Sequence, residues 1–393
     1  MPLDAADVAW LLTPEGVRAT EAAEAALRDG TPALTLLDRL RRDHTPDQAR
    51  SAVALAEGRR SATTKFTDAA SLYFDRESAE QATSDMVALH TARRFQGAHR
   101  IADLGCGAGG DALALALHAP VLAVDRDPGR LALTRANAAV RGLGDRVEAI
   151  EADVREPLAG DIDAAWLDPA RRDSSGRVMD PERWSPSLTD ALRIASGFAR
   201  AGIKVAPGID LALIPPDAEV EFISLEGRLV EAVVWMGSAV TSPRRATALP
   251  SGASIEGSPD AGGTPLSPPG HYLYDLDPAV GRASLVDRLA PDLGAWLLDD
   301  GLAYLSGNMP IDSPFARRFR VESVVPFAER RLLDALRGAD AGRVEVMRRG
   351  SPVDTNALEL RLNRALPGNG RVLTVALTRS RGEHIAIVCE RER

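Results

Sequence analysis

Cysteine is almost absent from this chain, and long apolar runs are absent altogether. The 393 residues include only Cys106 and Cys389, too few for a disulfide framework and too far from a second thiol for a metal-binding knuckle. No run of about 18 apolar residues is present that could span a membrane, and residues 1–12 lack the basic and apolar regions of a secretory signal. We therefore expect a cytoplasmic protein with reduced thiols, no metal and no membrane partner.

Lysine and aromatic residues are also scarce. The only lysines are Lys65 and Lys204, and aromatic residues make up 4% of the chain. The net charge of −9 argues against a globally basic nucleic-acid binder. The charge is unevenly distributed, because residues 311–393 hold 16 arginines against 11 acidic residues, a balance of +5 that leaves −14 for the remainder. Any basic surface is therefore expected to be local.

The length and the sequence pattern predict several domains. Helical spacing and start signals such as Thr45-Pro46 fill the first part of the chain, and strands alternate with helices from Ala98 onward. A segment rich in proline, glycine and serine then precedes a tail that reads as helix, strand, helix, strand, strand. We expect a helical region at 1–95, an α/β core at 96–240, a linker at 241–270 and a C-terminal region at 271–393.

A glycine-rich stretch at residues 100–111 is the most informative part of the sequence. A short apolar run ends at Asp103, and Gly105, Gly107 and Gly109 follow before a helix begins. Glycine is needed where the backbone takes a positive φ or where a ligand lies directly on it, so this turn predicts a nucleotide-binding surface. Because Gly105, Gly107 and Gly110 also satisfy the dinucleotide spacing, the glycines alone leave a nicotinamide cofactor open.

Acidic residues follow four successive strands, and this arrangement resembles the class I S-adenosylmethionine-dependent methyltransferases. The acids are Asp103, Asp125, Asp153 and Asp168. The resemblance implies a Rossmann-like, seven-stranded α/β core whose last two strands, near 219–224 and 229–235, are antiparallel. It also implies S-adenosylmethionine as cofactor, with the methionine part at Asp103, Gly105 and Gly107, the ribose at Asp125 and the adenine at Asp153. The remaining residues expected in the cofactor site are Gly109, Arg126 and Val154.

The sequence Asp168-Pro169-Ala170-Arg171-Arg172 is similar to the acceptor motif of the amino-methyltransferases. There the acid and the proline carbonyl hold the target amine, which gives Asp168 and Pro169 the expected catalytic roles. Ala170 and Arg171 depart from that motif, since it has a second proline and a stacking aromatic there. Arg171 and Arg172 could instead bind a substrate phosphate. The uridine C5 methyltransferases share a related motif but need a nucleophilic cysteine, and neither cysteine here stands in a suitable motif.

Two further resemblances concern the substrate. The segment 65–77 carries Phe66, Tyr73 and Phe74 and is similar to the stretch that precedes the core in trimethylguanosine synthases, so Phe66 and Phe74 are expected to contact substrate. Buried aromatics beside a helix cap are the alternative. The tail, with Arg348 and Arg349 in a basic turn, resembles a small α+β THUMP-like domain and implies an RNA partner. The arginines expected to share an RNA-binding face are Arg317, Arg318, Arg348, Arg349, Arg361, Arg364 and Arg371.

The sequence therefore predicts a methyltransferase that acts on tRNA or rRNA, with a base nitrogen as the acceptor. Three alternatives stay open. The first is a non-catalytic protein that binds S-adenosylmethionine or RNA, and the second is a small-molecule or protein methyltransferase whose tail serves oligomerisation. The third is a nicotinamide dehydrogenase, which the positions of Asp153 and Asp168 disfavour.

Overall fold

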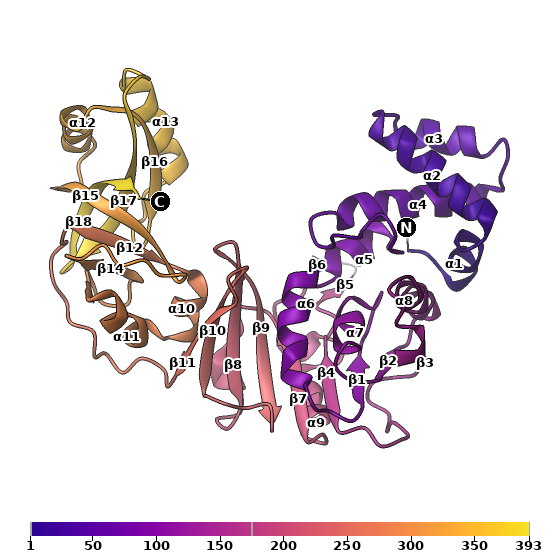
Figure 1. Ribbon diagram of the computed structural model, residues 1–393. Helices are drawn as coiled ribbons and strands as arrows, with labels where there is room; N and C mark the ends of the chain where they lie inside the picture. The colour runs from indigo at the N-terminus through magenta and orange to yellow at the C-terminus, as the bar shows by residue number, and fades with distance from the viewer. Residues whose placement is uncertain (1, 174–175, 393) are drawn as a thin grey trace. The chain divides into compact units, whose positions relative to one another are not determined.

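The computed structural model describes residues 2–173 and 176–392 and divides into two compact units (Figure 1). The first unit comprises Met1–Glu219 and Ala232–Thr241, and the second comprises Val220–Glu231 and Ser242–Arg393. In the part of the chain that the structure describes, no helix is both long and apolar enough to cross a membrane.

The first unit begins with a group of helices, as the sequence predicts. Asp4, Thr13 and Thr45 each cap a helix with their side chains, because a side-chain oxygen satisfies backbone N–H groups of the first turn. Apolar residues of this region, including Leu11, pack against Leu133 and Ala136 of the α/β core. The helices are α1 (Ala5–Leu11), α2 (Pro14–Arg28), α3 (Ala33–Leu40), α4 (Pro46–Ala62), α5 (Arg76–Gln81) and α6 (Asp85–Ala92).

The α/β core of the first unit is a predominantly parallel sheet with the strand order β9-β7-β4-β1-β2-β3. Only β9 runs antiparallel, against β7, and the other neighbours pair in parallel. The predicted Rossmann-like core is confirmed. Its strands are β1 (Ile101–Leu104), β2 (Val121–Asp125), β3 (Val147–Glu151), β4 (Ala164–Leu167), β7 (Arg200–Val205) and β9 (Arg228–Gly237), and its helices are α7 (Gly110–Leu115), α8 (Pro128–Val140) and α9 (Leu188–Ala195).

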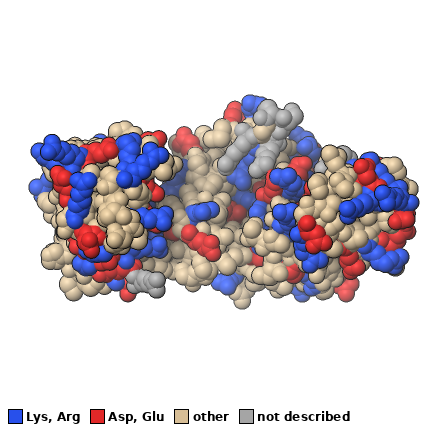
Figure 2. Space-filling model, turned by 90° about the horizontal axis from the view of Figure 1, so that it is seen from above, with Lys and Arg blue, Asp and Glu red and all other residues tan. Residues whose placement is uncertain are grey.

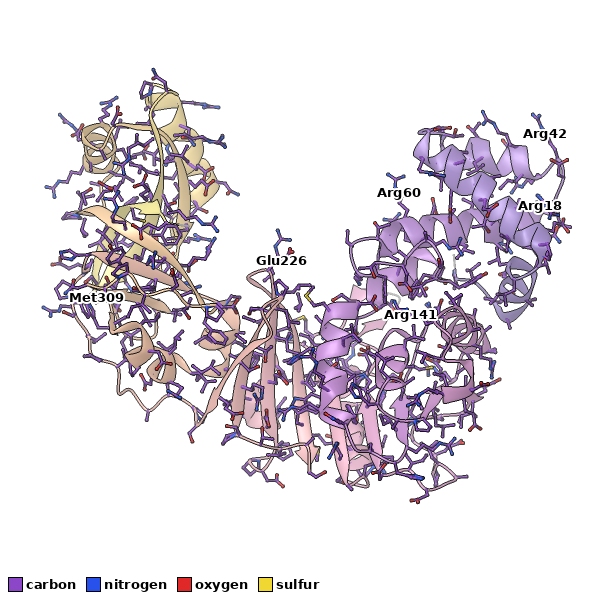
Figure 3. The ribbon with its side chains drawn as sticks, viewed as in Figure 1. Arg18, Arg42, Arg60, Arg141, Glu226 and Met309 are labelled. Carbon is purple, nitrogen blue, oxygen red and sulfur yellow. The ribbon has the colours of Figure 1, made fainter. Side chains whose placement is uncertain are left out.

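A tight hairpin joins β8 (Glu219–Leu225) to β9, as the short predicted connection requires. Glu226, labelled in Figure 3, and Gly227 both have positive φ, the conformation that two-residue hairpin turns use. In the second unit, β8 pairs in parallel with β10 (Arg244–Leu249), which pairs with β11 (Ala253–Gly257). The linker prediction is therefore wrong over these strands. Pro243, Pro250 and Gly252 lie next to the ends of these strands, while Ala246–Leu249 of β10 and Ile255 of β11 are buried.

A seven-stranded sheet with the order β13-β14-β12-β15-β18-β17-β16 forms the rest of the second unit. The predicted sequence of helix, strand, helix, strand, strand is confirmed by α12, β16, α13, β17 and β18. Both helices place leucines, among them Leu336 and Leu362, against this sheet. The elements are β12 (Tyr272–Leu276), α10 (Pro278–Ala283), α11 (Val286–Leu289), β13 (Ala295–Leu297), β14 (Tyr304–Gly307), β15 (Ala316–Pro326), α12 (Glu329–Gly338), β16 (Ala341–Arg348), α13 (Thr355–Ala365), β17 (Arg371–Ser380) and β18 (Glu383–Arg391).

Candidate functional site

The carboxyl ends of β1, β2 and β4 meet at one edge of the core sheet. Leu104 of β1 is in register with Val124 of β2 and with Leu167 of β4. The amide of Asp168 donates a hydrogen bond to the carbonyl of Leu104 at 3.2 Å. This register brings the acids that follow the strands to the edge where open α/β sheets bind their ligands.

The glycine-rich turn has the backbone that the sequence predicts. Gly105 and Gly107 have φ values of 89° and 55°. A side chain at Gly105 would come within 3.1 Å of the Asp168 carbonyl oxygen, whereas a Cβ at Gly107 would meet no atom within 4 Å. Gly107 therefore faces open space, which is the property required of a backbone on which a ligand lies. Gly109, with a φ of 86°, is the N-cap residue of α7 and packs against Thr134.

Asp103 is a buried acid that lacks a hydrogen-bond partner. Its relative exposure is 1%, and among the described residues neither of its carboxylate oxygens has a partner. Burial, together with the nearby acids Asp111, Asp168 and Asp125, raises the pKa of Asp103 well above its usual value. An unsatisfied buried polar group costs about 1–3 kcal/mol. A ligand that brought an ammonium group to this carboxyl would remove that cost.

Asp125 is the last residue of β2, and Asp153 follows β3. Asp125 accepts hydrogen bonds from the amides of Gly107 and Asp127, both at 3.0 Å. Asp153 is ion-paired with Arg155 through Oδ2 and Nη2 at 2.5 Å, and this hydrogen bond lowers the pKa of Asp153. Both acids are only half-buried, so both remain accessible to a ligand. Of their predicted neighbours, Arg126 is exposed and Val154 is half-buried.

Asp168 lies beside a lysine that the sequence-based predictions missed. Lys204 of β7 donates hydrogen bonds from Nζ to Asp168 Oδ2 and to Thr83 Oγ1, both at 2.7 Å. Thr83 donates to Asp111 Oδ2 at 2.9 Å, and burial raises the pKa of Asp111. The available signal was Lys204 itself, one of only two lysines and placed between the apolar residues Ile203 and Val205.

The loop after Asp168 is closed by backbone hydrogen bonds. Ala170 and Ser185 form an antiparallel bridge, and the amide of Val178 donates to the carbonyl of Arg171 at 2.9 Å. Pro169 is buried, and the Nη1 atom of Arg171 is buried without a partner among the described residues. The backbone of Arg172 begins β5 (Arg172–Asp173), which pairs with β6 (Gly176–Arg177), while its side chain lies outside what the structure describes.

The structure corrects the prediction that Phe66 and Phe74 contact a substrate. Their relative exposures are 2% and 0%, and their rings pack together with centroids 5.0 Å apart in the core of the first unit. Neither ring can contact a substrate, so the alternative of buried aromatics holds. The segment still borders the site, because a Cβ at Gly110 would lie 3.5–3.8 Å from Ala82, Thr83 and Phe66.

The predicted arginine face of the tail also needs correction. Arg349 donates to Asp275 Oδ1 at 2.9 Å and to the carbonyl of Leu276 at 2.6 Å, while Arg348 donates to the carbonyls of Ser351 and Val353. These contacts hold the turn together, so neither side chain is available for a substrate. Four more of the seven predicted arginines have a carboxylate partner: Arg317, Arg318, Arg361 and Arg371.

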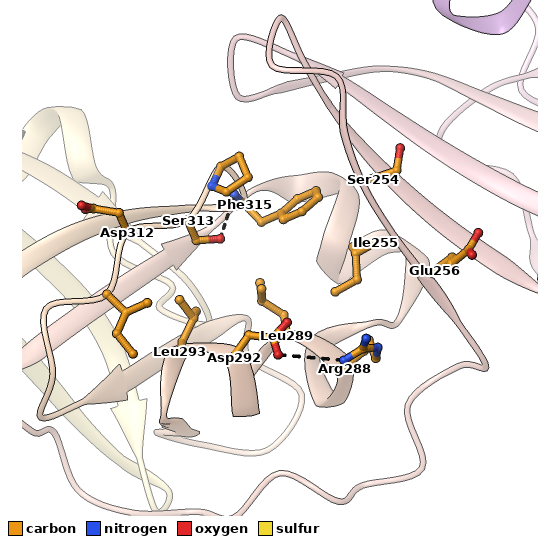
Figure 4. Close-up of a pocket in the computed structure, with 12 residues that line it drawn as sticks. Ser254, Ile255, Glu256, Arg288, Leu289, Asp292, Leu293, Asp312, Ser313 and Phe315 are labelled. Atoms are coloured by element: carbon orange, nitrogen blue, oxygen red, sulfur yellow. Dashed lines mark hydrogen bonds and ion pairs between the residues drawn. The ribbon is translucent and has the colours of Figure 1, made fainter. Parts of the chain in front are cut away.

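A cavity of about 290 Å³ lies within the second unit (Figure 4). Leu289 and Phe315 contribute apolar surface, and Arg288 and Asp292 form an ion pair at 4.0 Å on its wall. None of the predicted site residues lines this cavity.

Comparisons with known proteins agree with this geometry. An uncharacterized S-adenosylmethionine-dependent methyltransferase, found in two strains of Mycobacterium tuberculosis, is 37% identical over 314 residues, which cover 78% of this chain and 84% of the relative. The chain belongs to the S-adenosylmethionine-dependent methyltransferases. The dehydrogenase and non-catalytic alternatives are therefore wrong.

Family models and a solved structure extend this result. The family described as RNA cap guanine-N2 methyltransferase matches residues 98–179 of the methyltransferase, THUMP domain-like matches 316–391, and a domain of unknown function, DUF8688, matches 4–62. A Porphyromonas gingivalis protein with a provisional methyltransferase assignment has a crystal structure that covers 100% of both chains with a TM-score of 0.75. Its sequence identity of 19% supports the fold alone.

The residues of the methyltransferase site fit S-adenosylmethionine. The cofactor carries an ammonium group and a sulfonium, and the site offers a buried carboxyl at Asp103 without a partner among the described residues and an open backbone at Gly107. Half-buried carboxylates at Asp125 and Asp153 follow the next two strands. This combination of acids and bare backbone suits a cationic nucleoside better than a pyrophosphate.

Proposed function

We propose that this methyltransferase methylates a base nitrogen of tRNA or rRNA. The observation that carries the proposal is the position of Asp168, which follows β4 beside the glycine-rich turn and is held by Lys204 at 2.7 Å. Both family models with a described function point the same way, since one is named for an RNA cap guanine-N2 methyltransferase and the other for a THUMP-like domain.

Each residue of the cofactor site would contact one part of S-adenosylmethionine or support the turn. Asp103, Gly105 and Gly107 would hold the methionine part of the cofactor, with Asp125 at the ribose and Asp153 at the adenine. Gly109 supports the turn, and Arg126 and Val154 flank the two acids. Asp153 would exchange its ion pair with Arg155 for a hydrogen bond from the adenine amine. That exchange is inexpensive, because an exposed ion pair contributes only about 0–1 kcal/mol.

The acceptor side would orient the nucleophile rather than activate it. When bound, S-adenosylmethionine would supply a methyl group on a positively charged sulfur. Its transfer to the lone pair of the acceptor nitrogen would leave S-adenosylhomocysteine, and the nitrogen would release a proton to solvent. The Asp168 carboxylate and the Pro169 carbonyl would accept hydrogen bonds from the acceptor amine and aim its lone pair. Arg171 stands where the motif's stacking aromatic would lie, so this chain would hold the base without that aromatic.

Arg171 would bind a phosphate of the RNA. Its Nη1 atom is shielded from water and has no partner among the described residues, and a guanidinium in that condition gains most from a charged acceptor. Arg171 follows the acceptor acid by three positions, so a phosphate here would lie next to the target nucleotide. The Arg172 backbone continues into β5 beside it.

The RNA-binding surface of the tail would use arginines that have no carboxylate partner. Figure 2 shows basic and acidic side chains interspersed over the face that it presents, so the charges of that face do not by themselves identify the site. In the described part of the tail, exposed arginines without an ion pair or side-chain hydrogen bond lie on α12, β16, α13, β18 and the β17–β18 turn. They are Arg330, Arg331, Arg343, Arg364, Arg381 and Arg391.

Transfer of label from [methyl-³H]S-adenosylmethionine to unmodified tRNA and rRNA transcripts tests the proposal. We expect label in one RNA class with the wild-type protein and much slower labelling with Asp168→Asn, while both proteins bind the cofactor. Label in a protein or small-molecule fraction, with none in RNA, would instead support the alternative acceptor class. Nuclease digestion followed by nucleoside separation then identifies the modified base.

A further inference from the structure

Lys204 is buried at the acceptor side of the site. Its relative exposure is 5%, and it extends from β7, where Ile203 is in register with Leu167 of β4. Lys204 and Asp168 each follow this registered pair, so the two side chains are neighbours on one face of the sheet. The ammonium lies 2.7 Å from Asp168 Oδ2, 2.7 Å from Thr83 Oγ1 and 3.9 Å from Asp111 Oδ2.

Burying an ammonium group is expensive unless charged and polar partners replace its hydration. Here Asp168 supplies a carboxylate and Thr83 a hydroxyl, and that hydroxyl in turn donates to Asp111. A hydrophobic residue on this strand would avoid the cost, as its neighbours Ile203 and Val205 do. The buried ion pair therefore calls for an explanation other than packing.

Asp168 is the partner that connects Lys204 to the reaction. Its side chain is 26% exposed, whereas that of Lys204 is 6% exposed, so the pair presents carboxylate rather than ammonium to the acceptor side. Nζ donates to the Oδ2 atom of Asp168. An ion pair through this oxygen would fix the orientation of the carboxylate while its Oδ1 atom accepts from an incoming N–H group.

We propose that Lys204 is a positioning residue for methyl transfer: it holds the Asp168 carboxylate in one orientation toward the acceptor amine. The inference rests on the proposed acceptor role of Asp168. Lys204 touches neither cofactor nor acceptor in this arrangement, and it acts through Asp168. A purely structural role, in which Lys204 only ties the 83–85 segment to the sheet through Thr83, makes different predictions.

The scarcity of lysine allows a direct test of the ion pair. The full-length protein labelled with ¹³Cε-lysine has only two labelled residues, and Lys65→Met assigns their resonances by removing one. Lys65 donates to the carbonyls of Glu80 and Ala82, outside the Asp168 pair. We expect Asp168→Asn to shift the Lys204 resonance and leave that of Lys65 in place. An unmoved Lys204 resonance would overturn the proposal without reference to any substrate.

A double-mutant cycle on methyl transfer to RNA tests the positioning role. Lys204→Met should lower kcat by about 10²-fold, since misplacement of a reacting group by about 1 Å has that effect, with the Kd for S-adenosylmethionine unchanged. In the Asp168→Asn background the same substitution should lower kcat no further, because both changes remove one interaction. Lys204→Arg should recover part of the lost kcat, and Lys65→Met should retain wild-type kcat.

Two kinetic results would overturn the role. One is wild-type kcat for Lys204→Met, and the other is an equal reduction of kcat by Lys204→Met with and without Asp168. If Lys204→Met alone fails to fold, Lys204→Arg replaces it in the cycle, and the labelled Asp168→Asn protein still reports on the pair. If the wild-type protein transfers no label to RNA, the proposed function fails, whereas the lysine spectra continue to support or overturn the ion pair.

Discussion

The amide of Gly107 donates a hydrogen bond to the Asp125 carboxylate at 3.0 Å, which fastens the glycine-rich turn to the end of the neighbouring strand. One oxygen of Asp125 therefore supports the turn, and the other accepts from the Asp127 amide. Ribose hydroxyls would add to these bonds, since each carboxylate oxygen accepts more than one. Asp125 thus supports both the turn and the proposed ribose contact.

Asp125→Ala should weaken S-adenosylmethionine binding by about 1.5–3 kcal/mol, the range for hydrogen bonds to charged groups. Titration calorimetry measures the change. Asp145→Ala, which removes an exposed carboxylate from another loop of the same unit, is the matched control and should bind like the wild-type protein. An unchanged Kd for Asp125→Ala would exclude the ribose contact.

Asp103→Asn should stabilise the protein at pH 8 while weakening cofactor binding. Because burial raises the folded-state pKa of Asp103, this group's contribution to stability is greatest below the unfolded pKa and is lost as the pH rises through the folded pKa. The amide of asparagine does not ionise and so avoids that loss. The free energy of unfolding of the variant should therefore exceed that of the wild-type protein by about 1 kcal/mol or more at pH 8 and should not exceed it near pH 3.5. Urea denaturation at the two pH values measures the free energy of unfolding, and calorimetry measures cofactor binding. A variant that was less stable than the wild-type protein at pH 8 would contradict this account.

Arg155→Ala should leave cofactor affinity intact or raise it by up to about fivefold. Arg155 is ion-paired with Asp153 in this structure, and its side chain is 57% exposed. Removal of this ion pair should therefore cost little stability. Asp153→Ala, by contrast, should weaken binding. A large loss of affinity in Arg155→Ala would indicate that Arg155, and not Asp153, contacts the cofactor.

Arg141, marked in Figure 3, should be essential to the stability of the 65–85 segment. It donates to both Asp68 and Asp85 at 2.7–3.0 Å and lies over the Phe66 ring. Arg141→Met should lower the free energy of unfolding by about 1–3 kcal/mol, after allowance for partial exposure.

The pH dependence of that destabilisation provides a check. Arg141 lowers the folded-state pKa of Asp68, so the stability from this pair is present above the unfolded value of 3.8 and is lost as the pH falls through the lower folded pKa. The difference between wild type and Arg141→Met, measured by denaturation, should therefore shrink at acidic pH. A constant difference from pH 7 down to pH 2 would contradict the assignment.

The tail provides a prediction about RNA affinity. A triple variant, Arg330→Ala, Arg331→Ala and Arg364→Ala, should weaken RNA binding, and its salt slope should fall by about 0.7–0.9 for each phosphate that these arginines neutralise in the wild-type complex. Arg361→Ala removes an exposed arginine already paired with Glu329 and serves as the control. Filter binding over a salt series makes the measurement. Equal slopes for wild type and triple variant would remove this surface from RNA recognition.

Local patterns were sufficient to predict most of the fold. Strands ending in acids, glycines between them and helix-capping residues are short-range signals, so the core sheet and the C-terminal elements could be read from the sequence. The linker was misread because prolines at strand ends resemble prolines in loops. The strands β12 and β14 join the same sheet as the THUMP-like segment, so a truncation near Pro310 would split that sheet.

The candidate site was only half predictable, for a different reason. Asp103, Asp125 and Asp168 could be predicted because each lies at or just beyond the end of an apolar run. Lys204, Thr83 and Asp111 come together only through the register of β4 and β7 and the path of the segment before the core, and no local spacing encodes either. The charge count of the tail suggested a face of free arginines for the same reason. A count of residues does not indicate which arginines are ion-paired, and Arg349 is paired with Asp275.

Mass spectrometry of RNA nucleosides tests the central claim most directly. RNA from cells that lack this protein is compared with RNA from the same cells supplied with the wild-type protein or with Asp168→Asn. We predict one methylated nucleoside that disappears without the protein, returns with the wild type and does not return with Asp168→Asn. Identical nucleoside profiles in all three samples would contradict an RNA methyltransferase that uses Asp168.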